Sequence, residues 1–201
     1  MNGDRVSPQW RQWRSQMDLD EYEARFGRPD SHGEADFVQS LFAKQGGTGS
    51  VLDAGCGTGR LAIELHKRGM RLVGVDLDED LLARAQQKAP EIRWALADLA
   101  DMELARDFDV VVMAGNVMLF CRVEKRADVI HGCARHLKPG AVLVSGFSTQ
   151  IGDIEPLSIE TYDDLCESAG LTLTERWSTW DRQPYVTGGD YAVSVHHSSA
   201  R

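Results

Sequence analysis

The chain has 201 residues, of which 42% are hydrophobic and 26% charged, a composition typical of one globular domain with a packed core. The formal net charge is −9 at pH 7, and an acidic surface argues against a nucleic-acid partner. No apolar run approaches the roughly 20 residues that span a bilayer, and the polar stretch from Met1 to Trp13 lacks the core of a signal peptide. We therefore expect a cytoplasmic protein without a membrane partner.

Residues 1–49 are expected to form a short helical cap. Trp10, Trp13 and Met17 have the i, i+3, i+7 spacing of one helix face. A second helix is predicted to begin near Ser31. Two glycine-containing breaks interrupt the pattern, at Gly27-Arg28-Pro29 and at Gly46-Gly47-Thr48-Gly49. The second break predicts a flexible connection to the main domain, residues 50–201.

From residue 50 onward, strand and helix patterns alternate, which predicts a doubly wound parallel sheet of the α/β class. The predicted strands are 51–54, 71–75, 92–96, 108–113 and, after a turn at 138–140, 141–147. The predicted helices are 59–68, 80–89, 123–137 and 162–169. The last two strands, 171–181 and 190–196, have no helix between them and should pair antiparallel. Within the first of these, Trp177 and Trp180 should face opposite sides of the sheet.

One segment is more informative than the rest, and it runs Val51-Leu52-Asp53-Ala54-Gly55-Cys56-Gly57-Thr58-Gly59-Arg60. An apolar strand and an acidic residue lead into three glycines at every second position, and a helical pattern follows. Such a turn lets the backbone approach a ligand closely at a helix N-terminus. The dinucleotide fingerprint G-x-G-x-x-G would need a glycine where Arg60 stands, so pyrophosphate binding loses support.

This segment resembles motif I of the class I S-adenosylmethionine-dependent methyltransferases, and the resemblance covers about residues 50–196. It implies a Rossmann-like sheet of seven strands, mostly parallel with an antiparallel C-terminal hairpin. It also implies that the cofactor is S-adenosylmethionine, which leaves as S-adenosylhomocysteine.

The resemblance places the donor along the ends of successive strands. Asp76 lies about 20 residues beyond the glycine loop, where an acid can accept both ribose hydroxyls. The expected cofactor-binding residues are Asp53 for the ammonium; Gly55, Cys56, Gly57 and Gly59 for the amino-acid portion; Asp76 and Leu77 for the ribose; Asp98 and Leu99 for the adenine; and Ala114, Gly115 and Asn116 beside the sulfonium.

The methyl acceptor is not identified by the sequence. Methyl transfer from a sulfonium is an in-line displacement in which alignment and desolvation supply much of the rate, so no fixed catalytic signature is expected. A base is needed only if the nucleophile arrives protonated. His32 and Asn116 are the weak candidates for a catalytic role, and Tyr22, His32 and Trp180 are candidates for acceptor contacts.

The sequence lacks motifs of several methyltransferase classes, and this limits the kinds of methyl acceptor that we expect. The segment Ala114-Gly115-Asn116-Val117-Met118 is not an Asn/Asp-Pro-Pro-aromatic pattern, and Cys121 does not follow a proline, so it does not resemble the nucleophile of the cytosine-C5 enzymes. No group of acidic residues, histidines or cysteines has the spacing of a metal site. These features, with the acidic charge, favour a small-molecule acceptor. We further expect a monomer or a homodimer, a choice that the sequence leaves open.

Two further classes remain open. A protein that binds S-adenosylmethionine without transferring the methyl group, such as a sensor or a subunit, would carry the same donor motif. An NAD-dependent oxidoreductase would share the acidic residue at Asp76, but it would need the dinucleotide fingerprint that this chain lacks.

Overall fold

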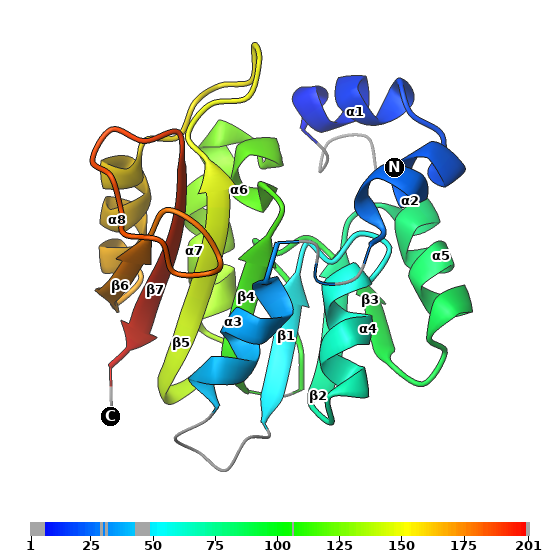
Figure 1. The fold of residues 1–201 in the computed structure, drawn as a ribbon, viewed down its shortest axis with the longest axis horizontal. Helices are drawn as coiled ribbons and strands as arrows, with labels where there is room; N and C mark the ends of the chain where they lie inside the picture. Colours follow the sequence, from blue (N-terminus) through cyan, green and yellow to red (C-terminus); the bar gives the residue numbers. More distant parts are fainter. Residues whose placement is uncertain (1–6, 29, 31, 43–48, 106, 200–201) are drawn as a thin grey trace.

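The computed structural model describes residues 7–28, 30, 32–42, 49–105 and 107–199, which form a seven-stranded sheet with helices on both faces (Figure 1). The strands are β1 (Ser50–Ala54), β2 (Arg71–Asp76), β3 (Arg93–Leu96), β4 (Phe108–Ala114), β5 (Leu137–Ser148), β6 (Leu171–Trp177) and β7 (Tyr191–Ser198). The helices are α1 (Pro8–Ser15), α2 (Leu19–Phe26), α3 (Glu34–Leu41), α4 (Arg60–Lys67), α5 (Glu79–Lys88), α6 (Val117–Phe120), α7 (Arg126–Ala134) and α8 (Ile159–Ser168).

The sheet has the order β3-β2-β1-β4-β5-β7-β6. The strands β1 to β5 pair in parallel, whereas β7 pairs antiparallel with both β5 and β6. The predicted α/β class, the doubly wound sheet and the antiparallel C-terminal pair are therefore confirmed. The chain builds outward from β1 in two directions, and the crevice at such a reversal is where open α/β sheets bind ligands.

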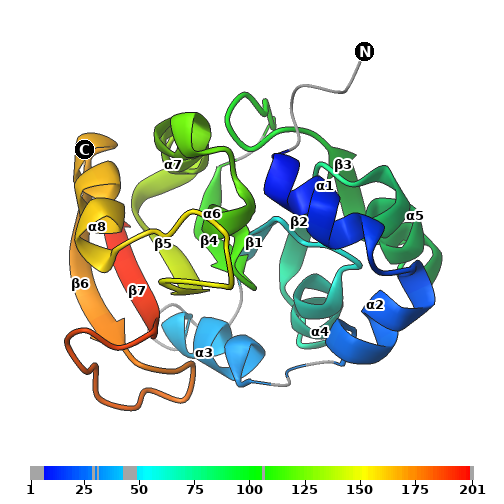
Figure 2. The same cartoon turned by 90° about the horizontal axis from the view of Figure 1, so that it is seen from above.

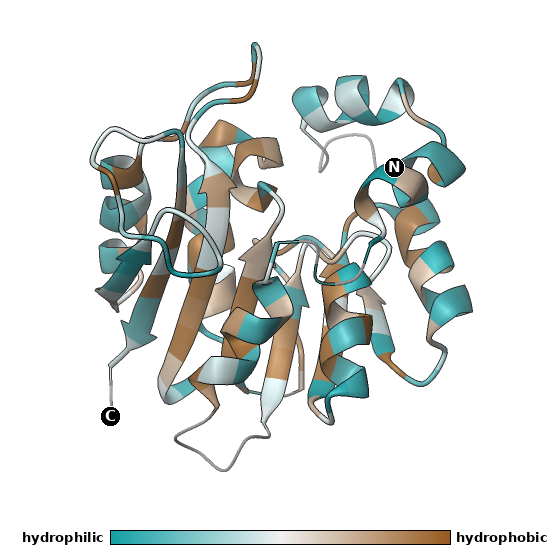
Figure 3. Ribbon diagram, viewed as in Figure 1, coloured by the Kyte–Doolittle hydropathy of each residue, from teal (hydrophilic) through white to brown (hydrophobic). Residues whose placement is uncertain are grey.

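Both faces of the central strands are buried, which is why every residue of β1 is buried rather than every second one. Val51 and Leu52 are both fully buried but belong to different hydrophobic clusters. The cluster around Val51 is covered by α3 and α4, and the cluster around Leu52 by α6, α7 and α8. Figure 3 shows this arrangement as brown strands between helices whose outer faces are teal.

The helices α1 and α2 lie over the carboxyl ends of the strands, on the side of α5 (Figure 2). Three ion pairs join them to the end of β2 and to α5: Arg14–Asp78 at 3.2 Å, Arg84–Asp20 at 2.8 Å and Lys88–Glu23 at 2.6 Å. Among the described residues, no helix has both the length and the hydropathy that crossing a bilayer requires.

The predicted helix face through Met17 is wrong. The helix α1 ends at Ser15, and Met17 lies buried in the turn before α2. The reason is local: the Asp18 carboxylate accepts a hydrogen bond from the Glu21 amide at 2.7 Å and so starts a new helix. The helix predicted to begin near Ser31 begins at Glu34. Ser31 itself, Pro29 and residues 46–48 of the predicted connection lie outside the described residues.

The predicted helix 123–137 is too long at both ends. Val123 lies in a short 3-10 turn and is half exposed, and Leu137 is the first residue of β5. The strand begins early because Leu137 pairs with Phe108 of β4. The register then shifts before Val142, so the predicted turn at 138–140 is a bulge inside β5.

The prediction for the two tryptophans is also wrong. The strand β6 ends at Trp177, so Trp180 lies in the turn that follows and the strand alternation does not reach it. Both indoles pack against the cluster on the α3 side of the sheet. Trp180 is held there by Phe37, with ring centroids 5.5 Å apart, and by a hydrogen bond from its Nε1 to the Tyr191 hydroxyl at 2.9 Å.

Candidate functional site

A cavity of about 1290 Å³ lies at the carboxyl ends of the parallel strands, below α1 and α2. Its wall includes all but one of the predicted cofactor-binding residues, together with the candidates Tyr22, His32 and Trp180. The exception is Gly59, which caps α4 with a φ of +79° and is not part of the wall. A Cβ at Gly59 would lie 2.4 Å from the Trp94 ring, so this glycine permits close packing behind the loop.

The glycine loop is tight and held from two sides. The amides of Gly55 and Cys56 both donate to the Val75 carbonyl, at 2.8 and 3.0 Å. Gly57 has a φ of +55°, and a Cβ there would lie 2.8 Å from the Tyr22 hydroxyl. The loop therefore brings bare backbone to the cavity below the cap.

The Asp76 carboxylate lies at the end of β2 and is shared between backbone donors. Its Oδ2 accepts from the Gly57 amide at 2.7 Å and its Oδ1 from the Asp78 amide at 2.9 Å. Burial raises the pKa of Asp76, and these backbone hydrogen bonds oppose the shift. Each oxygen keeps capacity for a further hydrogen bond from a ligand.

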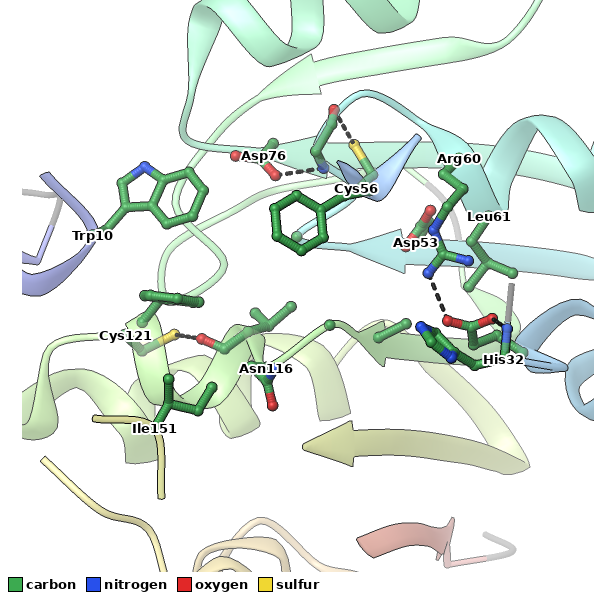
Figure 4. A pocket seen from close by; sticks show the side chains of 18 of the residues that line it. Trp10, His32, Asp53, Cys56, Arg60, Leu61, Asp76, Asn116, Cys121 and Ile151 are labelled. Carbon is green, nitrogen blue, oxygen red and sulfur yellow. Dashed lines mark hydrogen bonds and ion pairs between the residues drawn. The ribbon is translucent and has the colours of Figure 1, made fainter. Parts of the chain in front are cut away.

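Asp53 and Arg60 stand on either side of the glycine loop in the sequence, and both line the same cavity. Asp53 accepts from the Ala62 amide at 3.1 Å and is 3% exposed. Burial raises the pKa of Asp53 to about 7, and the nearby Arg60 charge limits the rise. Arg60 donates through Nη2 to Glu34 of α3 at 2.6 Å, while its Nη1 is buried with no hydrogen-bond partner among the described residues (Figure 4).

At the opposite end of the cavity, Asp98 accepts from the Ala100 amide at 3.0 Å, and Leu99 is buried in the wall. Cys121 is half-buried there, with its Sγ donating to the Val117 carbonyl at 3.2 Å. Burial raises the pKa of the Cys121 thiol to about 12, so the thiol stays protonated and does not act as a nucleophile at neutral pH.

An aromatic cluster roofs the cavity, and sequence reasoning missed most of it. Trp10 lies 5.2 Å from Phe120, and Trp13 lies 6.1 Å from Tyr22, between ring centroids. Phe26 completes the cluster. The spacing of the two tryptophans indicated a helix face, but only the fold shows that this face covers the loop after β4.

Beyond Asn116 the cavity continues between the loops that follow β5 and β6. Ile151 lies in the first loop (Figure 4), Trp180 lies in the second, and Tyr191 is the first residue of β7. Asn116 has a φ of +67°, and its Oδ1 accepts from the Ser148 amide at 2.7 Å, which joins the ends of β4 and β5. The further wall residues at this end are His32, Gly33, Ser178, Thr179, Asp181, Val186, Gly189 and Asp190.

Sequence reasoning identified His32 and Trp180 of this second half but missed Ile151, Tyr191 and the role of Arg60. Within the described part of the chain, no group of three or more His, Cys, Asp or Glu residues could hold a metal ion.

Comparisons with known proteins agree with this geometry. A family model described as "Methyltransferase domain" matches residues 51–140. The cypemycin N-terminal methyltransferase of a Streptomyces species is 35% identical over 94 residues, which are 45% of this chain and 38% of that protein. A dTDP-3-amino-3,4,6-trideoxy-alpha-D-glucopyranose N,N-dimethyltransferase of Streptomyces venezuelae is 32% identical over 111 residues, 55% of this chain and 46% of that protein. These matches span less than half the length of the two relatives.

A solved structure matches almost the whole chain. The TehB-like SAM-dependent methyltransferase of Corynebacterium glutamicum is 31% identical, with a TM-score of 0.77, over 95% of each chain. The family uses S-adenosylmethionine as its cofactor, which sets aside the NAD-dependent alternative. The strand order, the glycine loop and this match together show that the chain belongs to the class I S-adenosylmethionine-dependent methyltransferases.

Proposed function

We propose that this protein transfers the methyl group of S-adenosylmethionine to a small molecule that carries an amine. One observation carries the proposal: a single cavity runs from the expected donor residues past Asn116 to Ile151, Trp180 and Tyr191. Its volume of about 1290 Å³ exceeds the roughly 300–1,000 Å³ of a pocket for one ligand. The cavity is therefore large enough for the donor and an acceptor side by side.

The residues of the donor half fit S-adenosylmethionine. The unpartnered Nη1 of Arg60 suits the donor carboxylate, since a buried guanidinium N–H needs an acceptor. Asp53 would accept from the ammonium, directly or through water, and Asp76 would accept from the ribose hydroxyls. Asp98 and Leu99 would hold the adenine.

Bound there, the donor supplies a methyl group already activated by its sulfonium. The acceptor lone pair forms the new bond to the methyl carbon while the carbon–sulfur bond breaks and its electrons pass to sulfur. The protein then has to align the two molecules and exclude water. The packed rings of Trp10 and Phe120 cover the cavity and contribute to the exclusion of water. An acceptor that arrives protonated must lose a proton, and we assign His32 of the acceptor end as the candidate base.

The polar groups of the acceptor end support an amine. Asp181 and Asp190 bring carboxylates to this part of the wall, and Ser178, Thr179 and Tyr191 bring hydroxyls. Carboxylates attract an ammonium group, and hydroxyls suit a hydroxylated ligand. The relative from Streptomyces venezuelae is named for N,N-dimethylation of an amino sugar nucleotide, which supports the same acceptor chemistry.

Two experiments test the proposal in sequence. Calorimetric titration with S-adenosylmethionine, S-adenosylhomocysteine and NAD should show binding of the two sulfur compounds alone. The protein is then incubated with S-adenosylmethionine and paired acceptors, amino sugar nucleotides and their hydroxyl counterparts, while release of S-adenosylhomocysteine is measured. Release should require the amine. Donor binding without release would favour a binding protein, and release with the hydroxyl members alone would refute the amine assignment.

A further inference from the structure

The Glu34 carboxylate of α3 connects two parts of the cavity. Its Oε1 accepts from Arg60 Nη2 at 2.6 Å, and its Oε2 accepts from the backbone amide of His32 at 3.1 Å. Glu34 is 2% exposed although it is charged. The donor loop and the first residues of the acceptor wall therefore meet at one buried carboxylate.

Arg60 has the complementary position. It is the first residue of α4, directly after the glycine loop, and its guanidinium lies near Asp53 (Figure 4) and in contact with Glu34. One of its terminal nitrogens is used by Glu34, and the other, Nη1, is buried without a partner. A planar guanidinium can hold two carboxylates in a fixed geometry, whereas an ammonium acts as a point charge.

Two residues near Glu34 in the sequence, Asp30 and Asp36, are held to the end of α4 by a different residue, Arg68. Arg68 contacts Asp30 at 3.1 Å and Asp36 at 2.6 Å. The Asp36 side chain is 77% exposed, so this contact is a surface one and does not reach the cavity. Arg68 therefore holds Asp30 and Asp36 whether or not a ligand is bound. Glu34, in contrast, bonds to Arg60, the residue directly after the glycine loop.

We propose that Glu34 is a positioning residue that couples occupation of the donor carboxylate site to the order of the acceptor wall at His32. This inference rests on the proposed function, because it needs the donor carboxylate at Arg60. An anion at Nη1 fixes the guanidinium plane. Nη2 then fixes Glu34, and Glu34 fixes the His32 amide. Donor binding thereby prepares the acceptor half of the cavity.

The test compares two ligands that differ in the amino-acid portion. S-adenosylhomocysteine carries the carboxylate, and 5′-methylthioadenosine has the same nucleoside without it. The Ala35 amide donates to Asp30 at 2.8 Å and serves as the internal reference. Hydrogen exchange of the His32 amide, which donates to Glu34, is measured with each ligand at saturation. In the wild type, S-adenosylhomocysteine should slow this exchange about tenfold or more relative to 5′-methylthioadenosine, because it stabilises the local closed state.

Two variants separate the coupling from folding. Glu34→Gln keeps the shape of the side chain but removes the charge, and Arg60→Lys keeps the charge but lacks the planar fork that fixes two carboxylates relative to each other. Both should bind S-adenosylhomocysteine while the difference between the two ligands at the His32 amide disappears. Asp36→Asn is the matched control, because it removes an ion pair of the same segment outside the cavity, and it should keep the difference.

Each outcome decides the inference. Equal protection by both ligands in the wild type overturns the coupling, as does a ligand difference that survives in both Glu34→Gln and Arg60→Lys. A ligand difference lost equally in Asp36→Asn reduces Glu34 to one docking contact among several and also overturns it. A wild type that binds neither ligand refutes the proposed function itself, together with the coupling.

Discussion

The carboxyl group of Asp53 should make donor binding depend on pH in a direction that its burial determines. The pKa of Asp53 is raised from 3.8 to about 7, mainly because burial disfavours the charged form. The donor ammonium needs the carboxylate form. Free protein must therefore release a proton from Asp53 when the donor binds below this pKa.

The size of the effect follows from the pKa. With a pKa of about 7, Asp53 is ionised in about 9% of free molecules at pH 6 and in about 91% at pH 8. The apparent affinity for S-adenosylhomocysteine should thus fall about tenfold from pH 8 to pH 6, or about 1.4 kcal/mol. At pH 6.5, about three quarters of free molecules hold the proton, so binding should release about 0.8 proton.

Calorimetry in two buffers of different ionisation enthalpy measures both quantities. Asp53→Asn is the control, since an amide cannot release a proton. Its affinity should be lower at pH 8 by about 1.5–3 kcal/mol, the scale of a hydrogen bond to a charged group, and should vary less between pH 6 and pH 8. Wild-type affinity that does not change over this range would refute the reasoning, as would equal proton release by both proteins.

The same pKa has the opposite consequence for the free protein. Between pH 3.8 and about 7, the folded state keeps a proton on Asp53 that the unfolded state has lost. The contribution of Asp53 to the free energy of unfolding therefore falls as pH rises through this window. Denaturant titrations without ligand should show this trend in the wild type relative to Asp53→Asn, and a saturating donor should abolish it, since Asp53 is then ionised in both the complex and the unfolded chain.

Two further substitutions test the donor half, and a third tests the packing of α7. Asp76→Ala should weaken S-adenosylhomocysteine binding by about 1–3 kcal/mol, because the ribose hydroxyls and the Gly57 amide lose their acceptor, and unchanged calorimetric affinity would remove the ribose assignment. Gly57→Val should abolish binding while the circular dichroism spectrum persists, since the added atoms enter the space below Tyr22 at a backbone φ of +55°. Gly132→Ala should lower the free energy of unfolding by about 1–3 kcal/mol, because its Cβ would lie 1.9 Å from the Leu99 carbonyl oxygen, and an unchanged denaturation midpoint would contradict this.

The half of the cavity that we assign to the donor brings together residues that the sequence could locate, because they lie in local units. Asp53 and Asp76 each end a strand, and a loop or helix follows each within a few residues. Strand ends of a parallel sheet meet at one edge, so two local patterns and the strand order suffice to bring them together. Here the Gly57 amide bonds directly to Asp76 although 19 residues separate the two.

The error at Met17 has a local cause, the Asp18 cap of α2, but two other errors occurred where a distant partner decides a local boundary. The helical periodicity continues to Leu137, but pairing with Phe108 converts that residue to strand. The sequence pattern places Trp180 in a strand, because aromatic residues favour strands. In the fold it lies in a turn, where it is buried by contacts with Phe37 of α3 and Tyr191 of β7. Neither partner is adjacent in sequence, so no local pattern could have revealed the contact.

Arg60 shows why the acceptor half was harder to predict than the donor half. In the sequence it is the residue that stands where a dinucleotide-binding loop needs glycine, and its charge has no evident partner. The fold pairs it with Glu34, 26 residues earlier, in a helix that the sequence assigned to a separate cap. That helix packs on the sheet through buried residues such as Phe37, so it is part of the cavity wall rather than a detachable cover. Because Glu34 also accepts from the His32 amide, these two hydrogen bonds connect His32 of the cavity wall to Arg60, a connection that no local sequence pattern reveals.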